Sequence, residues 1–140
     1  MKKSYLFIAL ALIICGLTIN QADSKDKKQK NYVKVVYFHS DYRCATCNRL
    51  EAYSKETVHK YFTNEMESGK VLWAAINFDK KENKHFVDKF NLYNQSLIIM
   101  KYENGKLKDW KNLEKIWQLG GNQAKYFEYV KKEIEEYQKG

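Results

Sequence analysis

Short apolar runs and longer periodic stretches alternate along the chain from residue 32 onward. Residues 32–38 are β-branched and aromatic, which is typical of a buried strand. Between residues 50 and 66 apolar side chains return every three or four positions, which predicts one face of a helix. Residues 71–78 are almost continuously apolar and predict a second strand, covered on both faces of its sheet.

The second half of the chain continues this alternation. A polar segment from Asp79 predicts a second helix. Residues 96–102 and 107–111 predict two strands, and Asn104-Gly105 between them is the strongest short signal for a hairpin. The aromatic residues of the periodic stretches, the three tryptophans included, are interpreted as core.

A last helix, capped by Asn122 after the break at Gly120-Gly121, closes the predicted order βαβαββα. Right-handed crossovers make the first two strands parallel, and the hairpin makes the last two antiparallel. We therefore predict an α/β protein with a three-layer α/β/α fold, in which a mixed sheet ends in an antiparallel strand pair. This domain spans residues 32–138.

Residues 1–22 have the pattern of a secretory leader. Two lysines precede an uncharged run over residues 4–19, and the segment ends at the small residue Ala22. The run is shorter than the roughly 20 residues that span a bilayer, so we predict a cleaved signal peptide over 1–22 and a polar tether over 23–31. The protein is expected to be periplasmic or secreted.

Cys15 supports a second interpretation of the leader. It closes the apolar run and is followed by Gly16, which resembles the lipid attachment point of a bacterial lipoprotein. The mature chain would then be a membrane-anchored lipoprotein. In both cases the domain faces an oxidising environment, in which a close pair of cysteines can form a disulfide.

Composition and charge limit the remaining function classes. The chain has 140 residues, of which 44% are hydrophobic and 15% aromatic, so one domain with a real core is expected and intrinsic disorder is excluded. The net charge is +8, and four lysines of the excess lie between residues 25 and 30. The other lysines alternate with acids, so no nucleic-acid partner is predicted. Membrane contact is expected only through lipidation or an uncleaved leader.

Cys44 and Cys47 carry the clearest chemical signal. They lie three residues apart, where the first strand ends and the first helix begins. The unpaired N–H groups and the dipole of a helix N-terminus stabilise a thiolate. We therefore predict that Cys44 is the exposed nucleophile and Cys47 the thiol that resolves the mixed disulfide. The partners are protein thiols or a redox partner protein, and the redox-active disulfide Cys44–Cys47 takes the place of a cofactor.

Two neighbours are candidates for a supporting role. Arg43 would add a positive charge beside Cys44. His39 would favour the thiolate or pass a proton, although a partly exposed loop histidine without a role is the simpler interpretation.

Two other interpretations of the cysteine pair remain open. Thiolates of Cys44 and Cys47, together with His39, would suit a soft metal or metalloid. A structural disulfide is the simpler alternative. No second cysteine pair completes a tetrahedral zinc site.

Residues 32–138 resemble the thioredoxin-like superfamily. Within it, Val-Tyr-Phe-His at 36–39, Arg-Cys-Ala-Thr-Cys at 43–47 and residues 94–99 are most similar to a small exported bacterial group, the nitrophenyl compound nitroreductase subunits of the ArsF type. The resemblance implies a subunit of a reductase system that acts on nitroaromatics or in metalloid resistance. Other reductase subunits would then be partners and would supply any flavin or nicotinamide chemistry. An accessory subunit that serves docking alone is the third alternative.

Two departures from ordinary thioredoxins bear on the mechanism. The chain has no proline, and Ser96, or Leu97 in a shifted alignment, takes the place of the cis-proline opposite the cysteines. Since cis bonds are rare elsewhere, the bond at Ser96 is expected to be trans. Tyr37 takes the place of the buried acid beneath the cysteines, so proton transfer to or from Cys47 requires another group or water.

Overall fold

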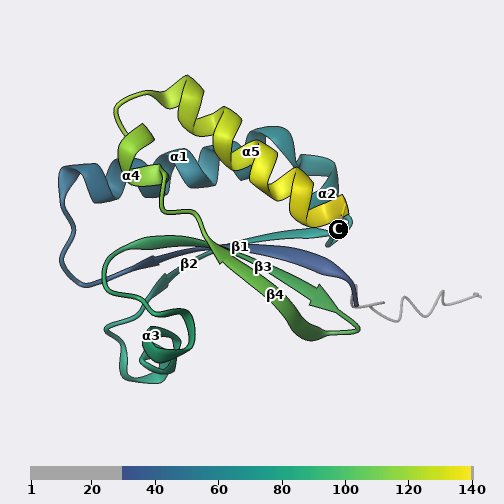
Figure 1. Ribbon diagram of the computed structural model, residues 1–140, viewed down its shortest axis with the longest axis horizontal. Coiled ribbons are helices and arrows are strands. Elements are labelled where there is room, and N and C mark those ends of the chain that lie inside the picture. The colour runs from purple at the N-terminus through teal and green to yellow at the C-terminus, as the bar shows by residue number, and fades with distance from the viewer. Residues whose placement is uncertain (1–29, 140) are drawn as a thin grey trace, which may run out of the picture.

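Four strands form one mixed sheet between two layers of helices (Figure 1). The computed structural model describes residues 30–139, so the predicted signal peptide, Cys15 and most of the predicted tether lie outside the described residues. The elements are β1 (Tyr32–His39), α1 (Ala45–Tyr61), α2 (Thr63–Glu67), β2 (Val71–Asn77), the 3-10 turn η1 (Lys81–Asn83), α3 (His85–Phe90), β3 (Ser96–Glu103), β4 (Lys106–Asn112), α4 (Ile116–Leu119) and α5 (Gln123–Lys139).

The strand order is β2-β1-β3-β4. β1 and β2 are parallel, whereas β3 is antiparallel to both β1 and β4. Helices α1, α2, α4 and α5 lie on one face of the sheet, and α3 lies on the other (Figure 1). The predicted α/β fold with three layers is therefore confirmed, as are the parallel first pair and the antiparallel last pair of strands.

The sheet separates two apolar cores, because successive side chains of a strand point to opposite faces. In β1, Val35 and Tyr37 enter the larger core, which α1 and α5 cover. Val36 and Phe38 enter the smaller core against α3. β3 divides its apolar residues in the same way, so both central strands are buried on both faces.

β2 is a strand as predicted, but both of its faces are covered only in part, since Trp73 packs against the larger core and Ala74 and Ile76 against the smaller one. It is an edge strand, and Leu72 and Ala75 are exposed. Val71 is the residue of β2 that is fully buried. An unbroken apolar run predicts a strand, but it does not determine whether the strand lies inside a sheet or at its edge.

The predicted hairpin joins β3 and β4. Asn104 and Gly105 both have positive φ, 51° and 75°, as the tight turn of a two-residue hairpin requires. Asn and Gly are the residues that adopt this conformation at least cost. The hairpin prediction is therefore confirmed.

The helix boundaries differ from the sequence pattern at two points. The periodic stretch over residues 50–66 is not one helix, because α1 ends at its C-cap Phe62 and α2 follows it. The polar segment after Asp79 begins with a turn and η1, and the helix itself starts at His85. At the start of α5 the prediction is confirmed, because the Asn122 side chain accepts a hydrogen bond from the Lys125 N–H at 3.0 Å. Within residues 30–139, none of the helices has the length and apolar character needed to cross a membrane.

A close contact at Gly120 supplies a test of the packing beneath α4. A Cβ atom at Gly120 would lie 2.8 Å from Cδ2 of Leu50, a fully buried core residue of α1. We expect Gly120→Ala to lower the free energy of unfolding by about 1–3 kcal/mol, because Leu50 must leave its rotamer or shift. Urea unfolding followed by far-UV circular dichroism measures the change.

The next residue provides a matched control. A Cβ atom at Gly121 would meet nothing within 4 Å, and its φ is not positive. Gly121→Ala is expected to leave the stability unchanged or raise it by up to about 1 kcal/mol through the unfolded chain. Equal losses in the two variants would contradict the steric explanation.

Buried tyrosines make the fold sensitive to alkaline pH. Tyr37 and Tyr126 are fully buried, and burial raises the pKa of both phenols well above the ordinary value of 10.0. Burial also raises the pKa of Tyr129 and Tyr137 to about 12. In the unfolded chain these phenols ionise near pH 10, so the unfolded state releases protons first.

The contribution of these tyrosines to the free energy of unfolding is therefore expected to be fully present below about pH 10. It should fall as the pH rises toward the folded-state pKa values. Each fully buried tyrosine should contribute a loss of about 1.4 kcal/mol per pH unit in this window. Urea unfolding between pH 8 and 11.5, with phenolate absorbance recorded in parallel, measures the slope. Tyr126→Phe is the control, and an unchanged slope in that variant would contradict the assignment.

Candidate active site

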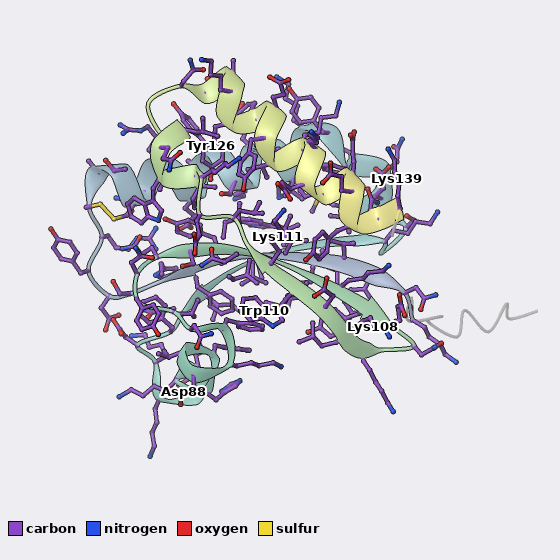
Figure 2. The ribbon with its side chains drawn as sticks, in the orientation of Figure 1. Asp88, Lys108, Trp110, Lys111, Tyr126 and Lys139 are labelled. Carbon is purple, nitrogen blue, oxygen red and sulfur yellow. A yellow bond between two sulfur atoms is a disulfide. The ribbon has the colours of Figure 1, made fainter. Side chains whose placement is uncertain are left out.

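Cys44 and Cys47 form a disulfide at the start of α1, with their Cα atoms 4.9 Å apart. Cys44 ends the loop that follows β1, and Cys47 lies in the first turn of the helix. Figure 2 shows the pair as the yellow bond at one end of α1. The sequence predicted both placements from the β-branched run and the helical period on either side of the motif.

Cys44 is the N-cap of α1. Its backbone is extended, and its Sγ accepts a hydrogen bond from the Cys47 N–H at 3.0 Å. The first turn of α1 holds no acidic side chain that would offset the helix dipole. After reduction, the same N–H and the dipole therefore stabilise negative charge on the Cys44 sulfur.

The two sulfur-bearing residues differ in exposure. Cys44 is half-buried, whereas Cys47 is 3% exposed. A partner molecule therefore reaches Cys44 more readily than Cys47. This asymmetry supports the predicted roles of attacking and resolving thiol, which themselves remain predictions.

The loop before Cys44 is fixed to the end of β2. The Asp41 N–H donates to Oδ2 of Asp79 at 2.7 Å, and Nδ2 of Asn77 donates to Oδ1 of Asp41 at 2.7 Å. The Asn77 hydrogen bond, with the nearby Lys80 ammonium, lowers the pKa of Asp41 from its ordinary value. Asp41 is therefore a charged anchor of this loop at neutral pH.

Tyr37 and Gln95 support the site from below. The Tyr37 hydroxyl lies 2.9 Å from the Cys47 carbonyl oxygen and 3.3 Å from Oε1 of Gln95, and it donates to these two acceptors. Nε2 of Gln95 donates to the Tyr42 carbonyl at 2.8 Å. Burial, with the charge of Glu51 as the second cause, raises the pKa of Tyr37, so this group is a neutral phenol at neutral pH.

The contacts of Arg43 differ from those expected. Its Nε donates to Oδ1 of Asn48 at 3.0 Å, and its guanidinium forms an ion pair with the Glu51 carboxylate. The positive charge that the sequence predicts beside Cys44 is therefore largely paired with an acid of α1. Support of the Cys44 thiolate by Arg43 stays a prediction.

The structure does not bring His39 and the two cysteines together as the ligands of a metal site. The Nδ1 atom of His39 lies 2.9 Å from the Ser40 carbonyl oxygen, at the end of β1. Among the residues that the structure describes, no three His, Cys, Asp or Glu side chains gather as they would around a metal ion. Cys44, Cys47 and His39 therefore do not form a ligand set in this structure.

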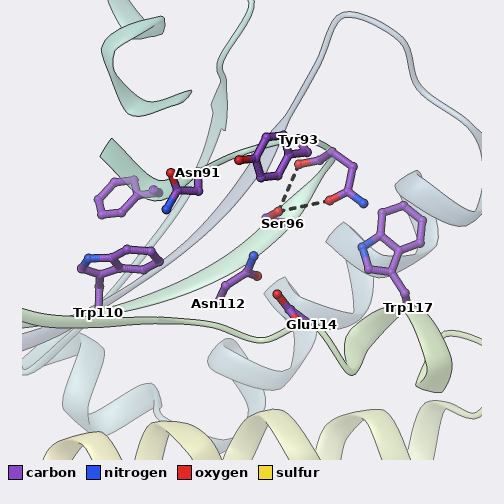
Figure 3. A pocket seen from close by; sticks show the side chains of 9 residues that line it. Asn91, Tyr93, Ser96, Trp110, Asn112, Glu114 and Trp117 are labelled. Carbon is purple, nitrogen blue, oxygen red and sulfur yellow. Dashed lines mark hydrogen bonds between the residues drawn. The ribbon is translucent and has the colours of Figure 1, made fainter. Parts of the chain in front are cut away.

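Ser96 begins β3, opposite Phe38 of β1. Its hydroxyl donates to the Asn94 carbonyl at 3.0 Å, and all peptide bonds in residues 30–139 are trans. Ser96 also lines a cleft of about 360 Å³ between β3, β4 and the start of α4 (Figure 3). The other walls of the cleft include Tyr93, Trp110, Asn112, Glu114 and Trp117.

Trp117 is not a core residue, contrary to the prediction. Its side chain is 38% exposed on the wall of this cleft, and its indole N–H donates to the Gln95 carbonyl at 3.1 Å. α4 is a single short turn in which Ile116 is the buried residue, and Trp117 beside it does not share that buried side. Gln95 thus joins the cleft to the loop that carries Cys44.

Gln95 and Glu51 are the site residues that the sequence did not reveal. Gln95 is a single polar residue before a strand, and nothing in its neighbours marks it as a hub of hydrogen bonds. Glu51 follows Cys47 by four residues, which is the spacing of one helical face, and this spacing could have indicated it.

The fold and the cysteine site together define the structural class of this protein. A mixed sheet with a parallel βαβ start, helices on both faces, and a Cys-x-x-Cys disulfide at the N-terminus of the first helix make up the thioredoxin-like fold. The chain has this fold, as its sequence predicted.

Comparison with known proteins adds no narrower family. No protein-family model matches the chain, and no curated protein matches it. Among solved structures, the oxidised thioredoxin of Plasmodium falciparum has 21% identity and a TM-score of 0.45, over 74% of this chain and 83% of that one. Thioredoxin O2 of Arabidopsis thaliana in its oxidised state has 15% identity and a TM-score of 0.40, over 69% and 76% of the two chains.

Proposed function

We propose that this protein is a thiol–disulfide oxidoreductase that works through the Cys44–Cys47 pair. The observation that carries the proposal is the position of the Cys44 sulfur. It caps α1, accepts the Cys47 N–H at 3.0 Å, and belongs to the more exposed residue of the pair. A sulfur in this environment is stabilised as a thiolate and can be reached by a partner.

In the reducing direction, the Cys44 thiolate attacks one sulfur of a partner disulfide. A bond forms between Cys44 and that sulfur, and the other partner sulfur leaves as a thiolate. Cys47 then loses its proton and attacks Sγ of Cys44, which forms the intramolecular disulfide and releases the second partner thiolate. The partner disulfide gains two electrons and the cysteine pair loses two. The reverse sequence oxidises a partner dithiol.

The proposed partners are proteins with thiols or disulfides, and the proposed site of action is outside the cytoplasm. The secretory pattern of residues 1–22 supports export, either as a cleaved protein or as a lipoprotein anchored at Cys15. An oxidising compartment maintains the supply of disulfides on which such chemistry depends.

A narrower proposal follows from the resemblance to the ArsF-type subunits alone. In it, the partner is another subunit of an exported reductase system that acts on nitroaromatics or in metalloid resistance. The contribution of this chain would be dithiol exchange through Cys44 and Cys47, and the partner subunits would bind the flavin or nicotinamide.

A redox titration of the mature protein tests the main proposal. Protein is equilibrated in graded mixtures of reduced and oxidised glutathione, and free thiols are counted after acid quenching and alkylation. We expect one two-electron transition of the Cys44–Cys47 pair, at a potential between about −120 and −270 mV. The midpoint indicates whether the protein acts mainly as an oxidant or as a reductant.

A pair that stays oxidised at every glutathione ratio would favour a structural disulfide and contradict the proposal. The same titration of reduced protein in the presence of Zn²⁺ tests the binding alternative. Stoichiometric protection of both thiols by the metal, together with slow exchange in its absence, would favour a thiolate site for soft metals.

A further inference from the structure

The second exchange step needs a proton acceptor close to Cys47. This residue is 3% exposed, so bulk water has little access to its thiol. A thiol must become a thiolate before it can attack a disulfide. Tyr37 lies beneath the first turn of α1, but it is a phenol whose pKa is raised, and it already donates to the Cys47 carbonyl. Tyr37 therefore cannot accept the proton at neutral pH.

Glu51 lies one helical turn after Cys47 on α1. Residues four apart share a face of a helix, with Cβ atoms about 5–6 Å apart, so the carboxylate can reach the thiol directly or through one water molecule. Burial, and then the negative charge of Glu51, raises the pKa of Tyr37, whose hydroxyl donates to the Cys47 carbonyl at 2.9 Å. The Glu51 side chain is 25% exposed, so it is partly shielded from solvent.

Arg43 orients this carboxylate. The guanidinium pairs with Glu51 and is itself held by Oδ1 of Asn48 at 3.0 Å. Arg43 directly precedes Cys44, so one ion pair connects the loop that carries the attacking thiol with the helix that carries the resolving thiol.

The other titratable and charged groups around this region do not compete for the proton. Tyr126 of α5 has a raised pKa and is bonded to Ser54 and to the Leu50 carbonyl. Arg49 of α1 donates to the Gly120 carbonyl at 2.8 Å, and a guanidinium has donors but no acceptor for a proton. His39 lies at the end of β1, where its Nδ1 is 2.9 Å from the Ser40 carbonyl oxygen. Glu51 is the carboxylate that lies one helical turn from Cys47 on the same face of α1.

We propose that the Glu51 carboxylate, oriented by Arg43, takes the proton from the Cys47 thiol in the resolving step. This inference rests on the proposed oxidoreductase function. It assigns the proton transfer to a side chain on α1, whereas the strand position beneath the cysteines holds Tyr37.

The step balances in protons and electrons. The Cys47 S–H bond breaks, and the proton moves to Glu51, which becomes a neutral carboxylic acid. The Cys47 thiolate then attacks Sγ of Cys44 in the mixed disulfide, and the partner sulfur leaves with the bonding electron pair. Glu51 returns its proton to the leaving thiolate or to solvent.

Stopped-flow reaction of the reduced protein with 5,5′-dithiobis(2-nitrobenzoic acid) separates the two steps. Attack by Cys44 releases one thionitrobenzoate, and resolution by Cys47 releases the second. We expect Glu51→Gln to leave the first phase within about twofold of the wild type. The second phase should slow about 10- to 100-fold at pH 7, toward the lower end of general base effects. The difference in second-phase rate between Glu51→Gln and the wild type should disappear near pH 10, where hydroxide removes the Cys47 thiol proton.

The controls distinguish a proton acceptor from a structural residue. Glu56→Gln removes an exposed carboxylate of the same helix and should change neither phase. Glu51→Asp keeps a base and should recover part of the second phase, and urea unfolding of each variant checks that it is folded. An equal second phase in Glu51→Gln and wild type at pH 7, or a deficit that persists at pH 10, would overturn the role of Glu51. A wild-type protein that releases no thionitrobenzoate would instead contradict the oxidoreductase proposal itself.

Discussion

Replacing Cys44 with serine is expected to abolish disulfide exchange. An alcohol at this position does not ionise near neutral pH and cannot form the mixed disulfide, so the rate with a protein disulfide should fall by at least about 1,000-fold, to the uncatalysed background. Reduction of insulin by dithiothreitol, followed by turbidity, measures the effect. Far-UV circular dichroism of the variant shows whether α1 and the sheet are retained.

The matched variant Cys47→Ser should behave differently. Cys44 remains able to attack, but the mixed disulfide cannot be resolved from within the chain, so a covalent complex with the partner should accumulate. Electrophoresis without reductant detects this complex, which dithiothreitol should release. If Cys44→Ser trapped partners as well as Cys47→Ser does, the assignment of attacking and resolving thiols would be wrong. Exchange that survives Cys44→Ser would contradict the role of Cys44 as the nucleophile. A partner complex that keeps its activity with Cys44→Ser would instead favour an accessory subunit that serves docking alone.

Phe38→Ala is expected to cause the largest loss of stability among single substitutions near the site. Phe38 is fully buried in β1, and its ring lies 5.2 Å from that of Phe86 and 5.6 Å from that of Phe90. Truncation removes the centre of the smaller core and leaves a cavity, which costs about 3–5 kcal/mol. The free energy of unfolding of native domains is about 5–15 kcal/mol in total, so this substitution would remove much of it.

Urea unfolding of the oxidised protein gives the free energy directly, with Phe38→Leu as the control. Leucine refills part of the cavity and should lose less than half as much stability as alanine. A loss below about 1 kcal/mol in Phe38→Ala would mean that the layer between the sheet and α3 contributes little to folding. The redox midpoint of Phe38→Leu should stay unchanged, because Phe38 points away from the face that carries α1.

The sequence predicted the parts of the fold that depend on local physical constraints. The turn at Asn104-Gly105 was predicted because few residue pairs adopt positive φ at both positions. The two central strands were predicted because apolar β-branched runs have few other stable environments. The edge position of β2 was not predicted, since it depends on which strands pair with each other. An apolar residue such as Leu72 fits the pattern of a central strand and of an edge strand equally.

In the candidate site, too, the features with a local sequence signal were predicted and those that depend on long-range contacts were not. The cysteine pair was found because its chemistry depends on two residues three apart at one helix start. Gln95 contacts Tyr37 across 58 residues and Tyr42 across 53, and no local pattern records such pairings. The ion pair of Arg43 with Glu51 joins a loop to a helix face, so it could be identified only once the path of the loop was known.

The N-cap of α1 has a consequence for how this chain can change. Serine, threonine, aspartate and asparagine are the strong caps, whereas a sulfur is a weak hydrogen-bond acceptor. Helix α1 therefore starts from a weak capping group, at the position where a stronger cap would remove the nucleophile. Selection for a more stable helix and selection for exchange act on Cys44 in opposite directions, so gains in stability that preserve function must come from other positions.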